Sequence, residues 1–279
     1  MSRAVPFASV VAFAGVLLAM TSPVHAYDAG LRAALVAVSE SSVFFGHQSV
    51  GANILHGVRD IASAEGVTLQ IQNVTPGSGV PPRGIGHAFV PENEDPLRKL
   101  ESFRKALGAR TGAPVQVALL KFCYVDFTRD TDARALFARY QETMRKIQVE
   151  NPGTTLVHVT VPLTTLQSGP KALVKRLLGR PVYGLVENAR RDEYNALLRV
   201  AYEGREPIFD LAMIEATAPD GRLQTAEWNG RAVPVLVADY TDDGEHLNAK
   251  GRIRAAREFL KVLAAVPKPI PVKPAAGMP

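Results

Sequence analysis

The segment VFFGHQSVGANIL, residues 43–55, places three polar side chains where an apolar run passes into a helical pattern. They are His47, Gln48 and Ser49. A serine hydroxyl at this position can cap the helix by accepting a hydrogen bond from an unpaired backbone N–H of the first turn. It can also act as a nucleophile, because those free N–H groups and the helix dipole favour a developing anion. The segment alone leaves both interpretations open.

A base for such a nucleophile lies near the end of the chain, in YTDDGEHLNAKG at 240–251. Asp243 and His246 stand three residues apart just before a helical pattern, so a turn can bring the carboxylate onto the imidazole. With Ser49 they would complete a triad in which the histidine takes the serine proton and the aspartate holds the histidine tautomer. The alternative is that Asp243 caps the following turn and His246 is a surface residue.

This combination resembles the SGNH (GDSL-like) hydrolase superfamily, whose members use an N-terminal serine and a C-terminal Asp-x-x-His. Leu247, Asn248 and Gly251 also fit the usual continuation of the terminal block, and the resemblance extends from residue 43 to about 260. It implies a flavodoxin-like α/β/α fold, a serine esterase and no cofactor. The serine block departs from the family pattern, because GHQS at 46–49 stands where Gly-Asp-Ser is usual.

The resemblance also implies two further donors to an oxyanion hole, a glycine N–H after the second strand and an asparagine side chain after the third. We expect the glycine to be Gly79, with Gly77 as the alternative, in NVTPGSGV. The asparagine has no counterpart, because the third strand runs into LLKFCYVDF. Asn93 is one candidate replacement, against a plain turn residue. His47 is another, as a substrate-binding or oxyanion-stabilising side chain, against a histidine held by a structural hydrogen bond.

Short apolar runs alternate with longer stretches of helical periodicity along the rest of the chain, as is typical of a parallel sheet covered by helices. The predicted strands are 42–46, 68–73, 115–122, 154–161 and 207–211, and the predicted helices are 50–64, 95–107, 132–149, 185–203 and 249–265. Ligands bind such sheets at the carboxyl ends of the strands, where Ser49 lies. We therefore expect one α/β domain, three-layer α/β/α with a five-stranded parallel sheet, interrupted by long loops at 74–94 and 162–184.

The first 26 residues have the pattern of a secretory signal peptide, with Arg3, an apolar run at 10–20 and then SPVHA. We expect a secreted or periplasmic protein whose domain spans 27–265 and is followed by a Pro-rich tail at 266–279. The apolar run is too short to cross a bilayer, which takes about 20 residues, so no stable membrane insertion of the mature chain is expected. The net charge is +5 and the charged residues are interspersed along the chain, which disfavours nucleic acid as a partner.

Other chemistry has less support in the sequence. Cys123, the only cysteine, is expected in the core rather than as a nucleophile paired with His158. Lys121 stands in an apolar strand, so we expect it to pair with a carboxylate such as Asp126 or to point to the rim. The Asp-x-x-His pair supplies only two ligands and no H-E-x-x-H run exists, so no metal is expected.

The sequence therefore predicts an exported serine ester hydrolase acting on a small-molecule or glycan ester, with carbohydrate O-acetyl groups as candidate substrates. Two alternatives stay open. One is a non-catalytic SGNH-like module that binds a glycan or protein of the cell envelope, and the other is an O-acyltransferase that uses the same triad.

Overall fold

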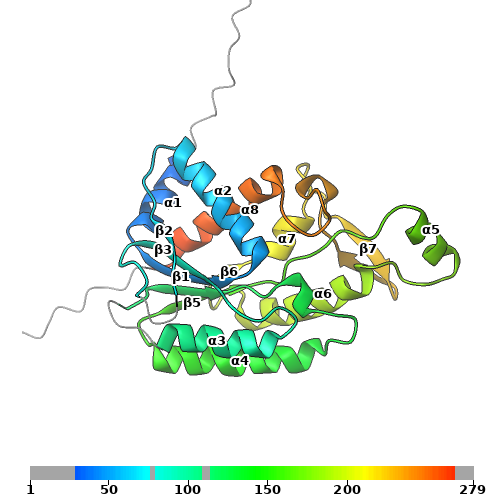
Figure 1. Cartoon of the computed structure of the whole chain (residues 1–279), viewed down its shortest axis with the longest axis horizontal. Helices are drawn as coiled ribbons and strands as arrows, with labels where there is room; N and C mark the ends of the chain where they lie inside the picture. The colour runs from blue at the N-terminus through cyan, green and yellow to red at the C-terminus, as the bar shows by residue number, and fades with distance from the viewer. Residues whose placement is uncertain (1–28, 76–78, 109–113, 268–279) are drawn as a thin grey trace, which may run out of the picture.

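The computed structural model describes residues 29–75, 79–108 and 114–267 (Figure 1). The expected signal peptide and residues 268–279 of the expected tail lie outside the described residues. The elements are α1 (Ala29–Ser39), β1 (Ser42–His47), α2 (Ser49–Ala64), β2 (Ile71–Asn73), β3 (Gly84–Phe89), α3 (Pro96–Gly108), β4 (Val117–Leu120), η1 (Tyr124–Asp126), α4 (Ala133–Glu150), β5 (Thr155–Val159), α5 (Pro170–Leu177), α6 (Leu185–Tyr202), β6 (Ile208–Phe209), α7 (Leu211–Ala216), β7 (Thr225–Trp228), β8 (Arg231–Pro234), η2 (Ala238–Tyr240) and α8 (Ala249–Ala265).

The central layer is a six-stranded sheet in the order β2-β3-β1-β4-β5-β6, with every neighbouring pair parallel. Helices α1, α2, α7 and α8 enclose one apolar core against the sheet, and α3, α4 and α6 enclose a second core on the opposite face (Figure 1). All six residues of β1 are buried, as expected for a parallel strand covered on both faces. The predicted three-layer α/β/α class is confirmed, with six strands instead of five.

Strand β3 lies inside the first predicted loop, which was therefore wrong over Gly84–Phe89. Its sequence GIGHAF carries glycines for close packing rather than for a turn. Gly84 has φ 91°, and a Cβ there would lie 2.3 Å from the Gln70 carbonyl oxygen, while one at Gly86 would lie 2.9 Å from Pro81. Because β3 and not β2 is the neighbour of β1, the loop that faces Ser49 is the one after Phe89.

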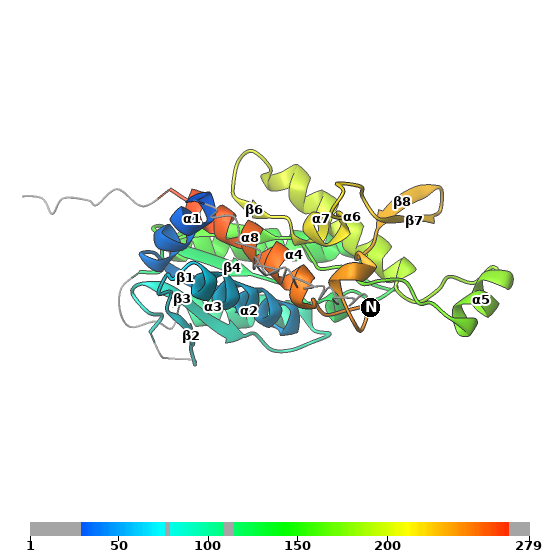
Figure 2. The same cartoon turned by 90° about the horizontal axis from the view of Figure 1, so that it is seen from above.

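The second predicted loop contains helix α5, which projects from the body of the domain in both views (Figure 1 and Figure 2). The antiparallel β7–β8 hairpin was not predicted either, because strands of four residues are too short to show a clear alternation. Over the described part of the chain, no helix has both the length and the apolar character needed to cross a membrane.

Candidate active site

Strand β1 ends two residues before Ser49, so Ser49 lies at the carboxyl ends of the sheet strands. Gly46 is required there, because a Cβ would lie 2.8 Å from both Phe103 and Val90. The His47 side chain then lies against the first turn of α2, where a Cβ on Gly51 would come within 2.4 Å of it. Gln48 takes the N-cap position and Ser49 is the first helical residue, so the simple capping interpretation of Ser49 was wrong.

Ser49, His246 and Asp243 form a connected hydrogen-bonded row. The Ser49 Oγ lies 3.0 Å from His246 Nε2, and His246 Nδ1 lies 2.7 Å from Asp243 Oδ2. A carboxylate can only accept, so Nδ1 carries the proton and Nε2 presents its lone pair to the Ser49 hydroxyl. The three side chains thus meet the distance requirement for a serine triad, although 197 residues separate Ser49 from His246.

The turn before α8 fixes the Asp243 carboxylate. Its Oδ1 accepts from the backbone N–H of Glu245 at 2.8 Å and of His246 at 2.7 Å, and its Oδ2 faces the imidazole. Burial acts to raise the pKa of Asp243, but these backbone and imidazole hydrogen bonds outweigh it and hold the pKa well below its usual range. Asp243 therefore both shapes the turn and orients His246, and the two interpretations offered by the sequence are compatible.

Contacts from two elements, α2 and η1, hold the His246 loop in place. Asn53, one turn after Ser49 on α2, accepts from the Leu247 N–H at 3.2 Å. The Tyr124 ring packs edge-on against the His246 ring with centroids 5.7 Å apart, and its hydroxyl donates to Glu245 at 2.8 Å. The imidazole is thus fixed from the serine side and from the η1 side.

The loops after β3 and β4 are joined by one buried carboxylate, that of Asp126. Asp126 accepts from the Glu94 N–H at 2.9 Å and the Cys123 N–H at 2.7 Å, and both of its oxygens lie 2.7 Å from Lys99 Nζ. The Lys99 and Asp126 side chains are fully buried. Glu94 has φ 70°, a left-handed conformation that is uncommon without glycine, and its N–H bond to Asp126 stabilises it.

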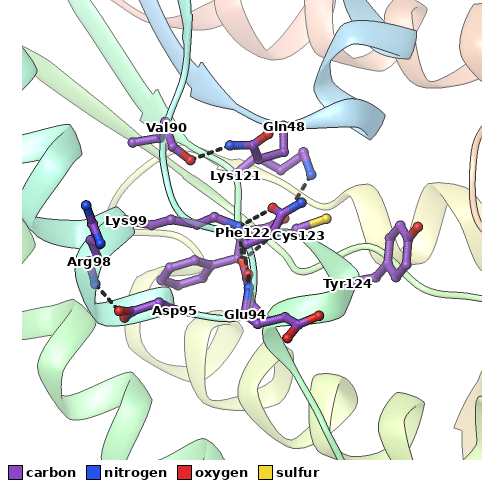
Figure 3. Close-up of polar contacts among 12 residues, drawn as sticks. Gln48, Val90, Glu94, Asp95, Arg98, Lys99, Lys121, Phe122, Cys123 and Tyr124 are labelled. Atoms are coloured by element: carbon purple, nitrogen blue, oxygen red, sulfur yellow. Dashed lines mark hydrogen bonds and ion pairs between the residues drawn. The ribbon is translucent and has the colours of Figure 1, made fainter.

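These contacts close a ring around the site. The Gln48 side chain, beside Ser49, donates to the Val90 carbonyl in the loop after β3 (Figure 3). Asp126 connects that loop to the loop after β4, and Tyr124 connects the second loop to the His246 turn. The Ser49–His246 hydrogen bond completes the ring. The position of His246 relative to Ser49 therefore depends on both rim loops.

A buried guanidinium supports the η1 part of this ring. Arg191 Nε and Nη2 lie 3.2 and 3.0 Å from the Tyr124 carbonyl oxygen, and Nη1 donates to Thr164 Oγ1 at 3.0 Å. Burial lowers the pKa of Arg191 to about 10, which leaves it charged at neutral pH. The charged Arg191 guanidinium donates two hydrogen bonds to the Tyr124 carbonyl and so fixes the Tyr124 backbone, whose side chain packs against His246.

His47 has no N–H to offer an oxyanion. Its Nδ1 lies 2.7 Å from the Gln48 carbonyl oxygen and must donate to it, so its Nε2 accepts from His87 Nδ1 at 3.0 Å. Both rings are neutral: burial lowers the pKa of His47 to about 3 and that of His87 to about 4. The structural interpretation of His47 therefore fits the geometry, and a donor role does not.

The expected oxyanion donors are separated by the structure. Gly79 is exposed and lies in the connection between β2 and β3, not in the loop after β3 that faces Ser49. Gly77 lies outside the described residues. Asn93, by contrast, lies in the loop after β3, where its Oδ1 accepts from Lys99 Nζ at 2.8 Å. That bond leaves the amide N–H groups of Asn93 directed away from Lys99.

Three further expectations can be compared with the coordinates. Cys123 is buried in the core, as expected. Lys121 is buried too, but its Nζ donates to the Phe122 carbonyl at 2.8 Å, and Asp126 pairs with Lys99 instead. The Asp126 carboxylate is instead occupied by Lys99, which comes from α3. In the described ranges, no group of three or more histidine, cysteine or acidic residues could hold a metal ion.

Several residues that hold the site were given no role from the sequence: Gln48, Asn53, Lys99, Tyr124, Arg191 and Glu245. Two of them carried a usable signal. Asn53 lies four residues after Ser49 and thus on the same helix face, and Gln48 lies next to the serine. The others come from elements whose proximity only the sheet order determines.

Comparison with known proteins finds similarity to solved structures. No family model and no curated protein matches the chain. It is similar to a GDSL-like lipase from Bacteroides thetaiotaomicron, with a TM-score of 0.47 and 12% identity over 81% of this chain and 88% of that chain. It is also similar to a Bacteroides fragilis protein described as an acylhydrolase, with a TM-score of 0.45 and 12% identity over 80% and 86% of the two chains.

A third similar structure is the periplasmic domain of a lipopolysaccharide acetyltransferase from Salmonella Paratyphi A, with a TM-score of 0.41 and 12% identity over 80% of this chain and 83% of that chain. The TM-scores and identities are low, so the functional proposal depends on the geometry of the site.

Proposed function

We propose that the chain is a serine ester hydrolase with Ser49 as nucleophile. The observation that supports this most directly is the 3.0 Å contact between Ser49 Oγ and His246 Nε2, together with the contact between His246 Nδ1 and Asp243 Oδ2. His246 takes the Ser49 proton as Oγ bonds to the ester carbonyl carbon, and then gives that proton to the departing alcohol. Water, activated by the same imidazole, releases the acid and restores Ser49.

Two donors are proposed for the oxyanion of the tetrahedral intermediate. The Ser49 N–H belongs to the first turn of α2, whose N–H groups have no intrahelical partner. The Asn93 amide is the second donor. Its support is the Lys99 bond to Oδ1, which sets the amide orientation, and the Gln48 bond, which ties the loop of Asn93 to the start of α2.

The proposed substrates are small-molecule or glycan esters, with O-acetyl groups on carbohydrates tested first. Export by cleavage after residue 26 is proposed on the pattern of the first 26 residues. N-terminal sequencing of protein recovered from the medium or the cell envelope tests it. A mature start near Tyr27 agrees with export, and an intact Met1 contradicts it.

Hydrolysis of p-nitrophenyl acetate by the purified chain tests the reaction. The Ser49→Ala variant should lose activity, and Ser63→Ala, an exposed serine at the other end of the same helix, should keep it. Asp243→Asn should lower kcat on the order of a thousandfold or more. Asp242→Asn, which removes a carboxylate bonded to Asn248 rather than to His246, is its matched control.

The outcomes separate the alternative functions. Activity that survives in the Ser49→Ala variant excludes the nucleophile. A wild-type chain that binds acetylated glycans without cleaving them is a binding module, and product that appears only with an added sugar acceptor identifies an O-acyltransferase.

A further inference from the structure

Residues 166–183 form an arm whose two ends meet beside the triad. The Gln167 N–H donates to the Tyr183 carbonyl at 3.0 Å, which closes the arm at its base. The Thr165 N–H donates at 2.8 Å to the carbonyl of Gly244, the residue after Asp243. The arm is therefore anchored on the catalytic turn, while its tip, helix α5, projects from the domain (Figure 1 and Figure 2).

Helix α5 exposes its apolar side chains. Leu173, Val174 and Leu177 are 59%, 54% and 78% exposed, and their spacing of i, i+1 and i+4 places them on one helix face. Ala172, on the opposite face, is 2% exposed. A two-turn helix that buries an alanine and exposes three larger aliphatic residues has its apolar face directed away from its own domain.

The charge of the tip has one sign. The segment PKALVKRLLGR at 170–180 contains four basic residues and no acidic residue. Lys171 and Arg180 are exposed, and Lys175, which donates to Gln167, is half-buried. Basic residues beside an exposed aliphatic face are the combination that binds anionic lipid headgroups and the outer part of the acyl chains together.

We propose that this arm docks the enzyme on an anionic lipid surface, with Leu173, Val174 and Leu177 inserted at the headgroup boundary. Because the tip projects from the domain, it can insert into a bilayer surface, which needs no groove of matching shape. Docking at the tip would bring the catalytic turn to esters presented at that surface, because Gly244 anchors the base of the arm. The substrate class rests on the proposed esterase function, whereas the binding itself does not.

A flotation assay of the complete purified protein with phospholipid vesicles tests the proposal. We expect binding to vesicles containing 30% phosphatidylglycerol, weaker binding to pure phosphatidylcholine, and loss of binding as salt screens the charges. The Leu173→Ser/Leu177→Ser variant should bind at least tenfold more weakly. Val149→Ser/Val200→Ser, which removes two side chains each 81% exposed on other helices, should bind like wild type.

A second pair of variants tests the contribution of the basic residues. Lys171→Gln/Arg180→Gln should reduce vesicle binding severalfold, and Lys105→Gln/Lys261→Gln, on α3 and α8, should not. All arm variants should hydrolyse soluble p-nitrophenyl acetate at the wild-type rate, so a failure of docking and a failure of esterase function remain distinguishable.

Two results overturn the docking proposal. One is equal vesicle binding by wild type and arm variants, or no binding by either. The other is a wild-type dimer in sedimentation that the leucine substitutions convert to a monomer without any vesicle binding, which would identify a second copy of the chain as the occupant of the α5 face.

Discussion

Lys99 Nζ lies 2.7 Å from both carboxylate oxygens of Asp126, and neither side chain has any exposed surface. One residue comes from α3 and the other from the η1 turn, so the ion pair joins the two loops that surround Ser49 and His246. The desolvation of two buried charges makes such a pair costly to break.

Lys99→Met should lower the free energy of unfolding by about 3 to 5 kcal/mol, because it leaves a buried carboxylate without its counter-ion. Lys105→Met is the matched control on the same helix: its pair with Glu101 is also 2.7 Å long but solvent-exposed, so the loss should stay below about 1 kcal/mol. Denaturant unfolding measures both. Equal losses in the two variants would contradict the role assigned to burial.

The double variant Lys99→Met/Asp126→Leu separates stability from function. Replacing a buried ion pair by apolar side chains often restores stability. The backbone N–H groups of Glu94 and Cys123 would still lose their acceptor, so we expect kcat to stay low after stability recovers. Recovery of both would mean that the ring does not position the triad.

The Asn93 amide gives a second prediction. Asn93→Asp keeps an oxygen for Lys99 Nζ but removes the N–H donors. An oxyanion donor is worth roughly a hundredfold or more in kcat, so kcat should fall by that factor while KM and unfolding stay close to wild type. Asn93→Ala should match it in kcat. Unchanged kcat in both variants would make Asn93 a plain turn residue.

The sequence predicted that Ser49, Asp243 and His246 would lie together because each signal is local. Ser49 follows a strand pattern and begins a helix pattern, and Asp243 and His246 share one short turn. The ring that holds them depends on contacts over long sequence separations. Tyr124 and Glu245 lie 121 residues apart, and no periodicity within either segment indicates that they meet.

The choice of Gly79 as an oxyanion donor depended on a sheet that lacked β3. Gly84 and Gly86 allow β3 to pass close to Gln70 and Pro81, but in sequence they have the composition of a loop. With β3 missed, the glycine donor was placed after β2, in the connection to β3 rather than in the loop after β3. Recognition of β3 would have directed the search to the loop that contains Asn93.

The raised pKa of Glu215 predicts a loss of stability as pH rises from 4.5 to about 8. Burial raises the pKa of Glu215 to about 8, against the opposing effects of the Leu163 N–H, Lys121 and Arg191. Between its ordinary pKa of 4.5 and about 8, the unfolded chain has lost this proton and the folded chain keeps it. The unfolding free energy should therefore fall as pH rises through this window, by up to about 1.4 kcal/mol per pH unit from this group.

Glu215→Gln isolates that contribution. The glutamine side-chain oxygen can still accept from the Leu163 N–H, which Glu215 binds at 2.6 Å, but it does not titrate. The stability difference between the variant and wild type should shift in favour of the variant from pH 5 to pH 8, measured by urea unfolding at each pH. A difference that is constant with pH would show that Glu215 does not carry a raised pKa.

The His47–His87 pair predicts the opposite slope at acid pH. Burial lowers the pKa of His47 to about 3 and that of His87 to about 4, from an ordinary 6.5. As pH falls below 6.5, the unfolded chain binds protons that the folded pair excludes, so stability rises with pH across this window and is lost toward pH 4. His87→Asn keeps an N–H donor for His47 Nε2 but removes one titrating ring. Its unfolding free energy should fall less steeply between pH 6.5 and 4 than that of wild type, and His56→Gln, on the exposed face of α2, should keep the wild-type slope. An identical slope in all three proteins would contradict a neutral buried pair, and with it the assignment of both His47 nitrogens to structural hydrogen bonds.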